Sequence, residues 1–176
     1  FHFGVAFIGS RSSTIEPTPG LLPAREENIE MVIDWLDEID STQPASMRGA
    51  TDFHGGLRTA FQMVDGERIE TNEHVDPRAF TDGADAIFVL TDGYPSIDAF
   101  HSYSEPNDQG QRTLIPGPYA NRIPHKVHHL LADIRRMNLL RRAQINCVSI
   151  GLGAADLLDA VAEVGVGEAT SLAANA

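Results

Sequence analysis

An apolar run that ends in an acid and a glycine constrains the fold of this chain more than any other feature. Residues 85–93 read Asp-Ala-Ile-Phe-Val-Leu-Thr-Asp-Gly. Five consecutive apolar residues, with β-branched and aromatic members, predict a strand that is buried on both faces of a sheet. The strand ends at Asp92, and open α/β sheets bind ligands beyond the carboxyl ends of their strands. Asp92 is therefore a candidate for metal or substrate contact, and the alternative is that Asp92 and Gly93 only form a turn.

Composition limits the class of protein and of partner. The 176 residues, 42% of them hydrophobic, are enough for one globular domain with its own core. The net charge of -12 argues against nucleic acid as a partner and favours cations. No apolar run approaches the roughly 20 residues of a membrane-spanning helix. The single cysteine, Cys147, lies in an apolar run and is expected to be a small buried residue.

Strand and helix patterns alternate along the chain. Apolar runs predict strands at 1–8, near 14–15, at 145–150 and at 169–172. Apolar residues at helical spacing predict helices over 24–39, after an N-cap at Thr51 or Asp52, from about residue 125, and around 157–161. This alternation predicts an α/β fold with a mostly parallel sheet and helices on both faces. Residues 65–83 and 94–124 show no period, and we expect them to be irregular insertions in a single domain spanning 1–176.

The predicted topology brings two distant residues to one edge of the sheet. If the central strand runs up to Asp92, the helix that precedes it runs down, so that its first turn near Thr51 lies at the same edge. A threonine hydroxyl and a carboxylate are hard oxygen ligands, which suit Mg²⁺ or Mn²⁺. The sequence therefore predicts a divalent cation at Thr51 and Asp92.

Three sequence motifs are similar to those of a known family. Residues 49–53 read Gly-Ala-Thr-Asp-Phe, residues 88–93 read Phe-Val-Leu-Thr-Asp-Gly, and residues 145–153 read Ile-Asn-Cys-Val-Ser-Ile-Gly-Leu-Gly. In this order they resemble the von Willebrand factor type A (vWA) domain. The resemblance implies a doubly wound, Rossmann-like α/β fold with a metal-ion-dependent adhesion site. Thr51 and Asp92 correspond to metal ligands of that site.

One part of the family pattern is missing. The family also has an Asp-x-Ser-x-Ser motif after its first strand, and these 176 residues contain none. Residues 1–8 look like the second strand of the family. The resemblance thus places the first strand and first helix upstream of Phe1, and it implies that this fragment alone binds Mg²⁺ or Mn²⁺ weakly.

Histidines offer a second set of candidate ligands. His125, His128 and His129, with Asp133 one turn on, have metal-ligand spacing on a helix. They lie opposite the apolar stripe of that helix, so the alternative is a solvated face. His54 lies one turn into the helix after Thr51, where it either lines the edge of the sheet or packs.

Two functions of different classes are consistent with these residues. The first is a protein-binding module, not an enzyme, in which the cation offers an open coordination position to a carboxylate of a protein partner. The second is a Mg²⁺-dependent phosphohydrolase or phosphotransferase with Asp92 as nucleophile or ligand. That chemistry needs a second acid or a cationic group nearby, whereas residue 94 is Tyr and the motifs at the edge hold no lysine. A third alternative is a scaffold domain that binds no metal.

Overall fold

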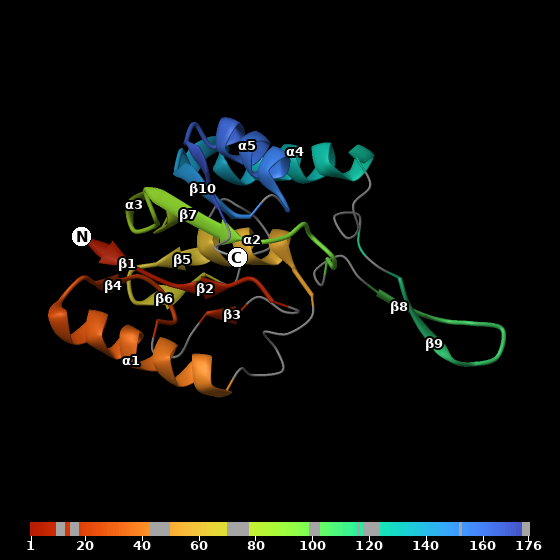
Figure 1. The fold of residues 1–176 in the computed structure, drawn as a ribbon, viewed down its shortest axis with the longest axis horizontal. Helices are drawn as coiled ribbons and strands as arrows, with labels where there is room; N and C mark the ends of the chain where they lie inside the picture. Colours follow the sequence, from red (N-terminus) through yellow and green to blue (C-terminus); the bar gives the residue numbers. More distant parts are fainter. Residues whose placement is uncertain are drawn as a thin grey trace.

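The computed structural model describes residues 1–9, 13–14, 18–42, 50–69, 78–98, 103–115, 117, 124–151 and 153–173 (Figure 1). These residues form a mixed α/β structure with five helices and a three-stranded parallel sheet. The α/β class that the alternating pattern predicts is therefore confirmed. The helices are α1 (Glu26–Thr42), α2 (Phe53–Gln62), α3 (Arg78–Thr81), α4 (Pro124–Arg141) and α5 (Ala155–Val164). Within the described ranges, none of these helices has both the length and the apolar character needed to cross a membrane.

The parallel sheet consists of β7 (Ala86–Thr91), β10 (Gln144–Ile150) and β11 (Ala169–Leu172). The strand order is β11-β10-β7, and both pairings are parallel. All three strands lie where the apolar runs predict them. Because they run in the same direction, their carboxyl ends meet at one edge of the sheet, which we call the rim.

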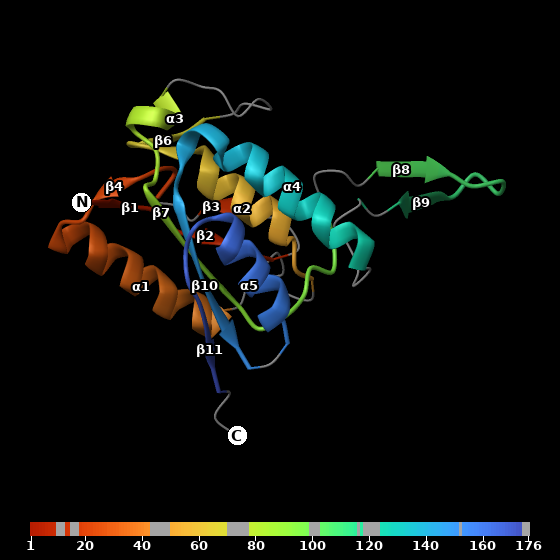
Figure 2. The ribbon, with the colours of Figure 1, turned by 90° about the horizontal axis from the view of Figure 1, so that it is seen from above.

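Helices α2, α4 and α5 pack on one face of this sheet, the covered face (Figure 2). Its sheet residues Ile87, Val89, Ile145 and Cys147 belong to the same buried cluster as the apolar stripes of the helices. The stripe predicted for α4 is confirmed, because Leu130, Ile134 and Met137 are buried and Val127 and Leu131 pack against them.

The opposite face of β7 differs from the prediction. Burial alternates along this strand, and Phe88 and Leu90 are 68% and 58% exposed. The prediction that the strand is buried on both faces was therefore wrong. An apolar run shows that both faces can be buried, but only one of them meets covering helices among the described residues.

Helix α1 lies on the side of the sheet away from α4 and α5 (Figure 1). Its predicted position is confirmed, but its apolar stripe is only partly buried. Val32 is buried, and the Trp35 ring lies 5.4 Å from the Phe7 ring, centroid to centroid. Three of the apolar residues at helical spacing in this helix, Ile29, Ile33 and Leu36, are exposed.

The remaining strands form four antiparallel pairs. They are β1 (His2–Phe3) with β4 (Leu22–Pro23), β2 (Ala6–Phe7) with β3 (Ser13–Thr14), β5 (Met63–Val64) with β6 (Glu67–Arg68), and β8 (Tyr103–Pro106) with β9 (Arg112–Ile115). The single strand predicted over residues 1–8 is thus two short strands. The strand predicted near residues 14–15 is confirmed as β3, and it pairs with β2.

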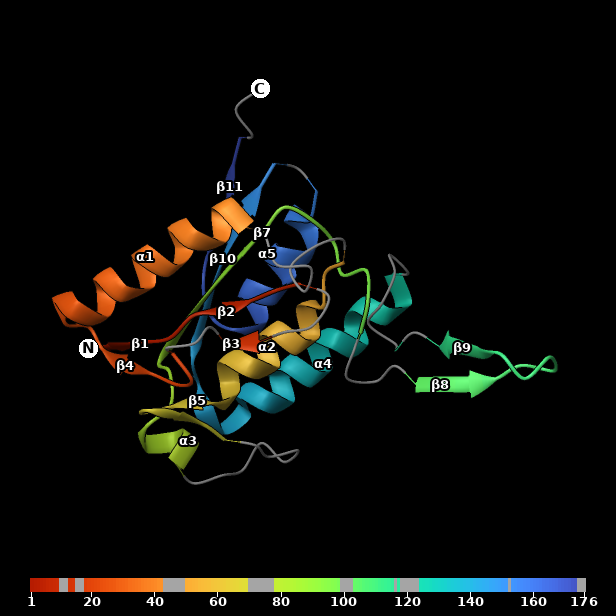
Figure 3. The same ribbon diagram turned by 90° about the horizontal axis from the view of Figure 1, so that it is seen from below.

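Both segments predicted to be irregular contain regular structure where the chain is described. Residues 65–83 include β6 and α3, and residues 94–124 include the β8–β9 hairpin, which projects from the rest of the molecule (Figure 3). The Asn107 side-chain oxygen accepts hydrogen bonds from the backbone N–H groups of Gln109 and Gln111, and Gly110 takes a positive φ of 75°. This turn closes the hairpin, and the residues of the turn, not an apolar period, are its signal in the sequence. Within these two segments, residues 70–77, 99–102, 116 and 118–123 lie outside the described residues.

Candidate functional site at the rim

Thr51 and Asp92, the two predicted metal ligands, both lie at the rim. Thr51 comes two residues before the first residue of α2, and Asp92 directly follows β7. The Thr51 backbone N–H donates to the Ser96 hydroxyl at 2.7 Å, and the Thr51 carbonyl accepts from the Ser96 N–H at 3.0 Å. The loop that follows β7 is therefore bonded directly to the residue that leads into α2, across 45 positions of sequence.

The turn at Asp92 is fixed by its neighbours, and the residue is exposed. The Thr91 hydroxyl bonds with the backbone of Gly93, donating to its carbonyl at 3.2 Å and accepting from its N–H at 3.3 Å. The Asp92 carbonyl oxygen lies 2.3 Å from the place where a Cβ would stand at Gly153, so only glycine fits there without a shift. Asp92 thus lies at a bend directly after β7, and this bend leaves it exposed to solvent.

The residue that caps α2 is Asp52, one of the two predicted candidates. Its Oδ1 accepts a hydrogen bond from the Gly55 N–H at 3.1 Å, and its own N–H donates to the Gly9 carbonyl at 2.9 Å. Asp52 is buried by these contacts, whereas Thr51 is half-buried. The capping carboxylate therefore stabilises the first turn of α2 and ties it to the end of the β2 segment.

The chemistry of the rim suits a hard divalent cation, but the donors are few. Thr51, Asp92 and Ser96 bring oxygen ligands of the kind that Mg²⁺ and Mn²⁺ prefer. In the part of the chain that the structure describes, no three His, Cys, Asp or Glu residues gather into a group that could hold a metal ion. Bound water or a partner would have to supply most of the coordination shell.

The histidines predicted as alternative ligands do not form a described cluster. His128 and His129 are exposed on α4, with ring centroids 5.2 Å apart, as expected for a solvated face. The side chain of His125 lies outside the described residues. Asp133, predicted as a fourth ligand on the same helix, instead forms an ion pair with His54 of α2.

The pair His54–Asp133 forms a polar contact between α2 and α4. His54 Nε2 lies 2.6 Å from Asp133 Oδ2, and the side chain of His54 is buried, whereas that of Asp133 is 11% exposed. Burial alone would raise the pKa of Asp133, but hydrogen bonds from His54 and Arg136 outweigh it and hold this pKa below its ordinary value. His54 therefore packs inside the fold. It shares a helical stripe with Leu57 and Phe61, a spacing that favours packing over a place on the rim.

Cys147 is buried on the covered face, as predicted. Burial and the nearby negative charge of Asp159 raise the pKa of its thiol to about 11. A thiol with this pKa is almost entirely protonated at neutral pH, so it is a poor nucleophile and a poor metal ligand.

Comparison with known proteins gives no family to which the chain can be assigned. No family model, no curated protein and no solved structure matches it. Its function must therefore be inferred from the geometry of the rim and from the motifs in its sequence.

Proposed function

We propose that this chain is a protein-binding module of the vWA type, with a doubly wound sheet and a divalent cation at Thr51 and Asp92. The bonding of Thr51 to Ser96 carries the proposal, since it joins the two motifs that the resemblance requires at one site. Two further features support it. The contact of Asp92 with Gly153 brings the loop before α5 to the same rim, and helices lie on both sides of the parallel sheet.

In this proposal the domain presents the bound cation to a protein partner and catalyses no reaction. Mg²⁺ demands near-octahedral coordination and keeps several waters when a protein offers one or two oxygen ligands. A carboxylate of a protein partner can replace one of these waters and complete the shell. The Asp92 carboxylate would supply the negative charge and the Thr51 hydroxyl a neutral donor. With so few protein ligands, we expect these 176 residues to bind the cation weakly, with a dissociation constant on the order of millimolar.

Paramagnetic Mn²⁺ tests the site directly, because it broadens the NMR signals of nearby amides. We expect selective broadening of the amides of residues 51, 92 and 96. Asp92→Asn should abolish it and Thr51→Ala should weaken it. Asp108→Asn is the matched control, since it removes the same charge from the exposed turn of the β8–β9 hairpin and should change nothing. Broadening that persists in Asp92→Asn, or that follows Asp108, would show that the site is misplaced.

Partner binding separates the proposal from its two alternatives. A carboxylate-bearing partner should be retained in Mg²⁺ and released by chelator, and Asp92→Ala should lose this response while its thermal melt stays close to that of the unaltered chain. Retention that ignores chelator would indicate the metal-free scaffold. Mg²⁺-dependent hydrolysis of a generic phosphoester that disappears in Asp92→Asn would indicate the phosphohydrolase and contradict the proposal.

A further inference from the structure

One face of the parallel sheet carries large apolar side chains that are exposed to solvent, with the polar residues Asn146 and Thr170 among them. Side chains alternate between faces along a strand, and residues that pair in parallel register share a face. Leu90 pairs with Val148, and Ile150 pairs with Leu172. The face opposite the covered face therefore carries Phe88, Leu90, Val148, Ile150 and Leu172, and we call it the bare face. Four of the five are exposed large hydrophobic residues. A contiguous exposed apolar patch of this kind typically marks an interaction site.

Helix α1 adds a second apolar strip on the same side of the sheet. Ile29, Ile33 and Leu36 are exposed and recur at i, i+4 and i+7, so they form one stripe of the helix. The bare face points away from α4 and α5, and α1 also lies on that side (Figure 1).

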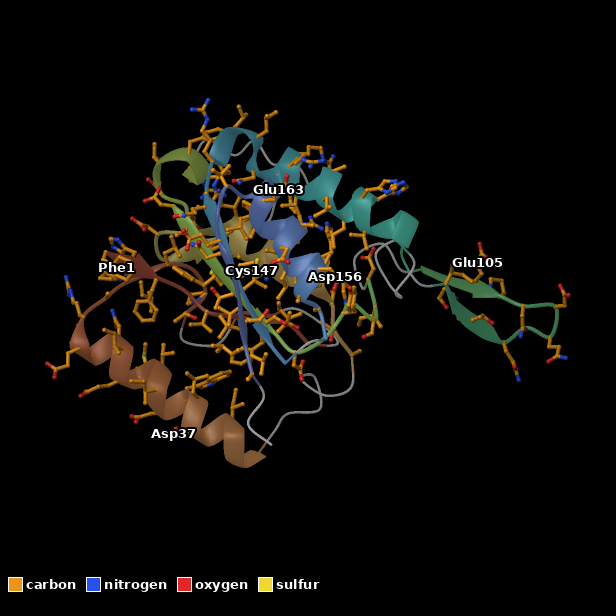
Figure 4. The ribbon with its side chains drawn as sticks, turned by 45° about the horizontal axis from the view of Figure 1, so that its top comes forward. Phe1, Asp37, Glu105, Cys147, Asp156 and Glu163 are labelled. Atoms are coloured by element: carbon orange, nitrogen blue, oxygen red, sulfur yellow. The ribbon has the colours of Figure 1, made fainter. Side chains whose placement is uncertain are left out.

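The charge of α1 indicates what could bind there. Its sequence contains seven acidic residues and neither lysine nor arginine (Figure 4 labels Asp37 among them). Asp34 and Asp37 are exposed beside the stripe. An occupant of this side would therefore bring its apolar groups to the sheet and its positive charges to α1.

We propose that the bare face and α1 together bind a basic amphipathic helix of a protein partner. A helix is the element that ordinarily covers a face of a parallel sheet. An apolar stripe would pack on Phe88 and Leu90, and flanking Lys or Arg residues would meet the acids of α1. A second copy of this chain fits poorly, because it would place another α1 and another net charge of -12 against the first. An anionic membrane would be repelled for the same reason.

Two synthetic peptides test this surface without knowledge of the natural partner. Both are 18-residue helices with one leucine stripe, flanked by lysines in the first and by glutamates in the second. Fluorescence anisotropy is measured with chelator present, so that the result does not depend on a cation at the rim. We expect the lysine peptide to bind at least about tenfold more tightly than the glutamate peptide, and added salt to weaken it.

Variants of the chain locate the binding surface. Leu90→Asp should weaken binding of the lysine peptide at least about tenfold. Leu139→Asp is the matched control, because Leu139 is 70% exposed on α4, which packs on the covered face. The double variant Asp34→Lys, Asp37→Lys should reduce binding of the lysine peptide and increase binding of the glutamate peptide. Thermal melts of each variant show whether it is folded.

Several outcomes would overturn the proposal. Equal loss in Leu90→Asp and Leu139→Asp would mean that the peptide binds apolar surface without a defined site. Equal affinity for the two peptides would remove the role of α1. A dimer of the chain alone in analytical ultracentrifugation that Leu90→Asp dissociates would identify a second copy as the occupant.

Discussion

The covered face and the bare face of the parallel sheet are built by the same three strands, and they differ only in what lies over them. Ile145 and Cys147 point to the covered face and are buried, whereas Val148 and Ile150 of the same strand point to the other face. Both sets of side chains are apolar. Apolar character therefore decides which residues can be buried, and the position of α2, α4 and α5 decides which of them are.

We expect the largest difference in the free energy of unfolding between alanine variants of two isoleucines of β10. Ile145 is fully buried on the covered face, and Ile150 is 43% exposed on the bare face. Ile145→Ala should lower the free energy of unfolding by about 3–4 kcal/mol, because it removes buried surface and leaves a cavity. Ile150→Ala should lower it by under about 1 kcal/mol, since little burial is lost. Urea unfolding of both variants gives the two values.

The two isoleucines control for each other, because they share residue type and strand. Similar losses for Ile145→Ala and Ile150→Ala would show that the two faces are equally buried in solution. A large loss at Ile150 alone would show that the bare face is covered and the covered face is loosely packed. Either result would contradict the assignment of one covered and one exposed face.

The sequence predicts the local elements well because their signals are local. The stripe of α4, the apolar run of β10 and the short final strand β11 each need only neighbouring residues to be recognised. Whether Phe88 is covered depends instead on elements distant in sequence. The apolar pattern of a strand is the same whether helices cover one of its faces or both. The β8–β9 hairpin was missed because its signal lies in the turn at Asn107 and Gly110, and not in apolar residues.

The candidate site shows the same division between local and distant information. Alternation of strands and helices predicts that Thr51 and Asp92 lie at one edge of the sheet, and the structure bonds Thr51 to Ser96 of the loop that follows Asp92. The sequence could not choose between Thr51 and Asp52 as the helix cap, since both are good capping residues. Spacing along α4 suggested Asp133 as a ligand beside the histidines, whereas its partner His54 comes from α2, 79 positions away.

A smaller effect on stability is expected from the pair His54–Asp133 between α2 and α4. His54→Ala should lower the free energy of unfolding by about 2 kcal/mol, because it leaves the buried Asp133 carboxylate without this hydrogen bond. The pair should also make stability depend on acid. The folded pKa of Asp133 lies below its ordinary value of 3.8, so its stabilisation is complete above that pH and is lost as the pH falls through the folded pKa. Urea unfolding from about pH 6 to about pH 2 measures this dependence.

An exposed ion pair provides the control for the buried one. Glu67 bonds with Arg78, and both side chains are at least half exposed. Glu67→Gln should change the free energy of unfolding by under about 0.5 kcal/mol, since solvent screens the pair. Asp133→Asn should flatten the acid dependence, and Glu67→Gln should leave it in place. If the two variants have the same acid profile, the His54–Asp133 pair contributes nothing particular to stability.

A thiol on each face of the sheet compares the two faces with the least change to the fold. The quantity compared is the alkylation rate of Cys147 and of a cysteine placed at position 90. Val89 pairs with Cys147 and Leu90 with Val148, so a cysteine at position 90 would lie one residue further along the sheet and on the opposite face. With a pKa of about 11, the Cys147 thiol is ionised to roughly one part in 10⁴ at pH 7, and its neighbours exclude reagent as well. Leu90→Cys in a Cys147→Ala background presents an exposed thiol of ordinary pKa, ionised to roughly a few per cent at pH 7. We therefore expect alkylation at position 90 to be at least about 100-fold faster than at Cys147 in the unaltered chain. Mass spectrometry of timed samples gives both rates.

The lysine peptide should slow the reaction at position 90 and leave Cys147 unaffected, because only the bare face gains a cover. Equal rates without peptide would mean that both faces open, or both are covered, and the division of the sheet into two unlike faces would fail.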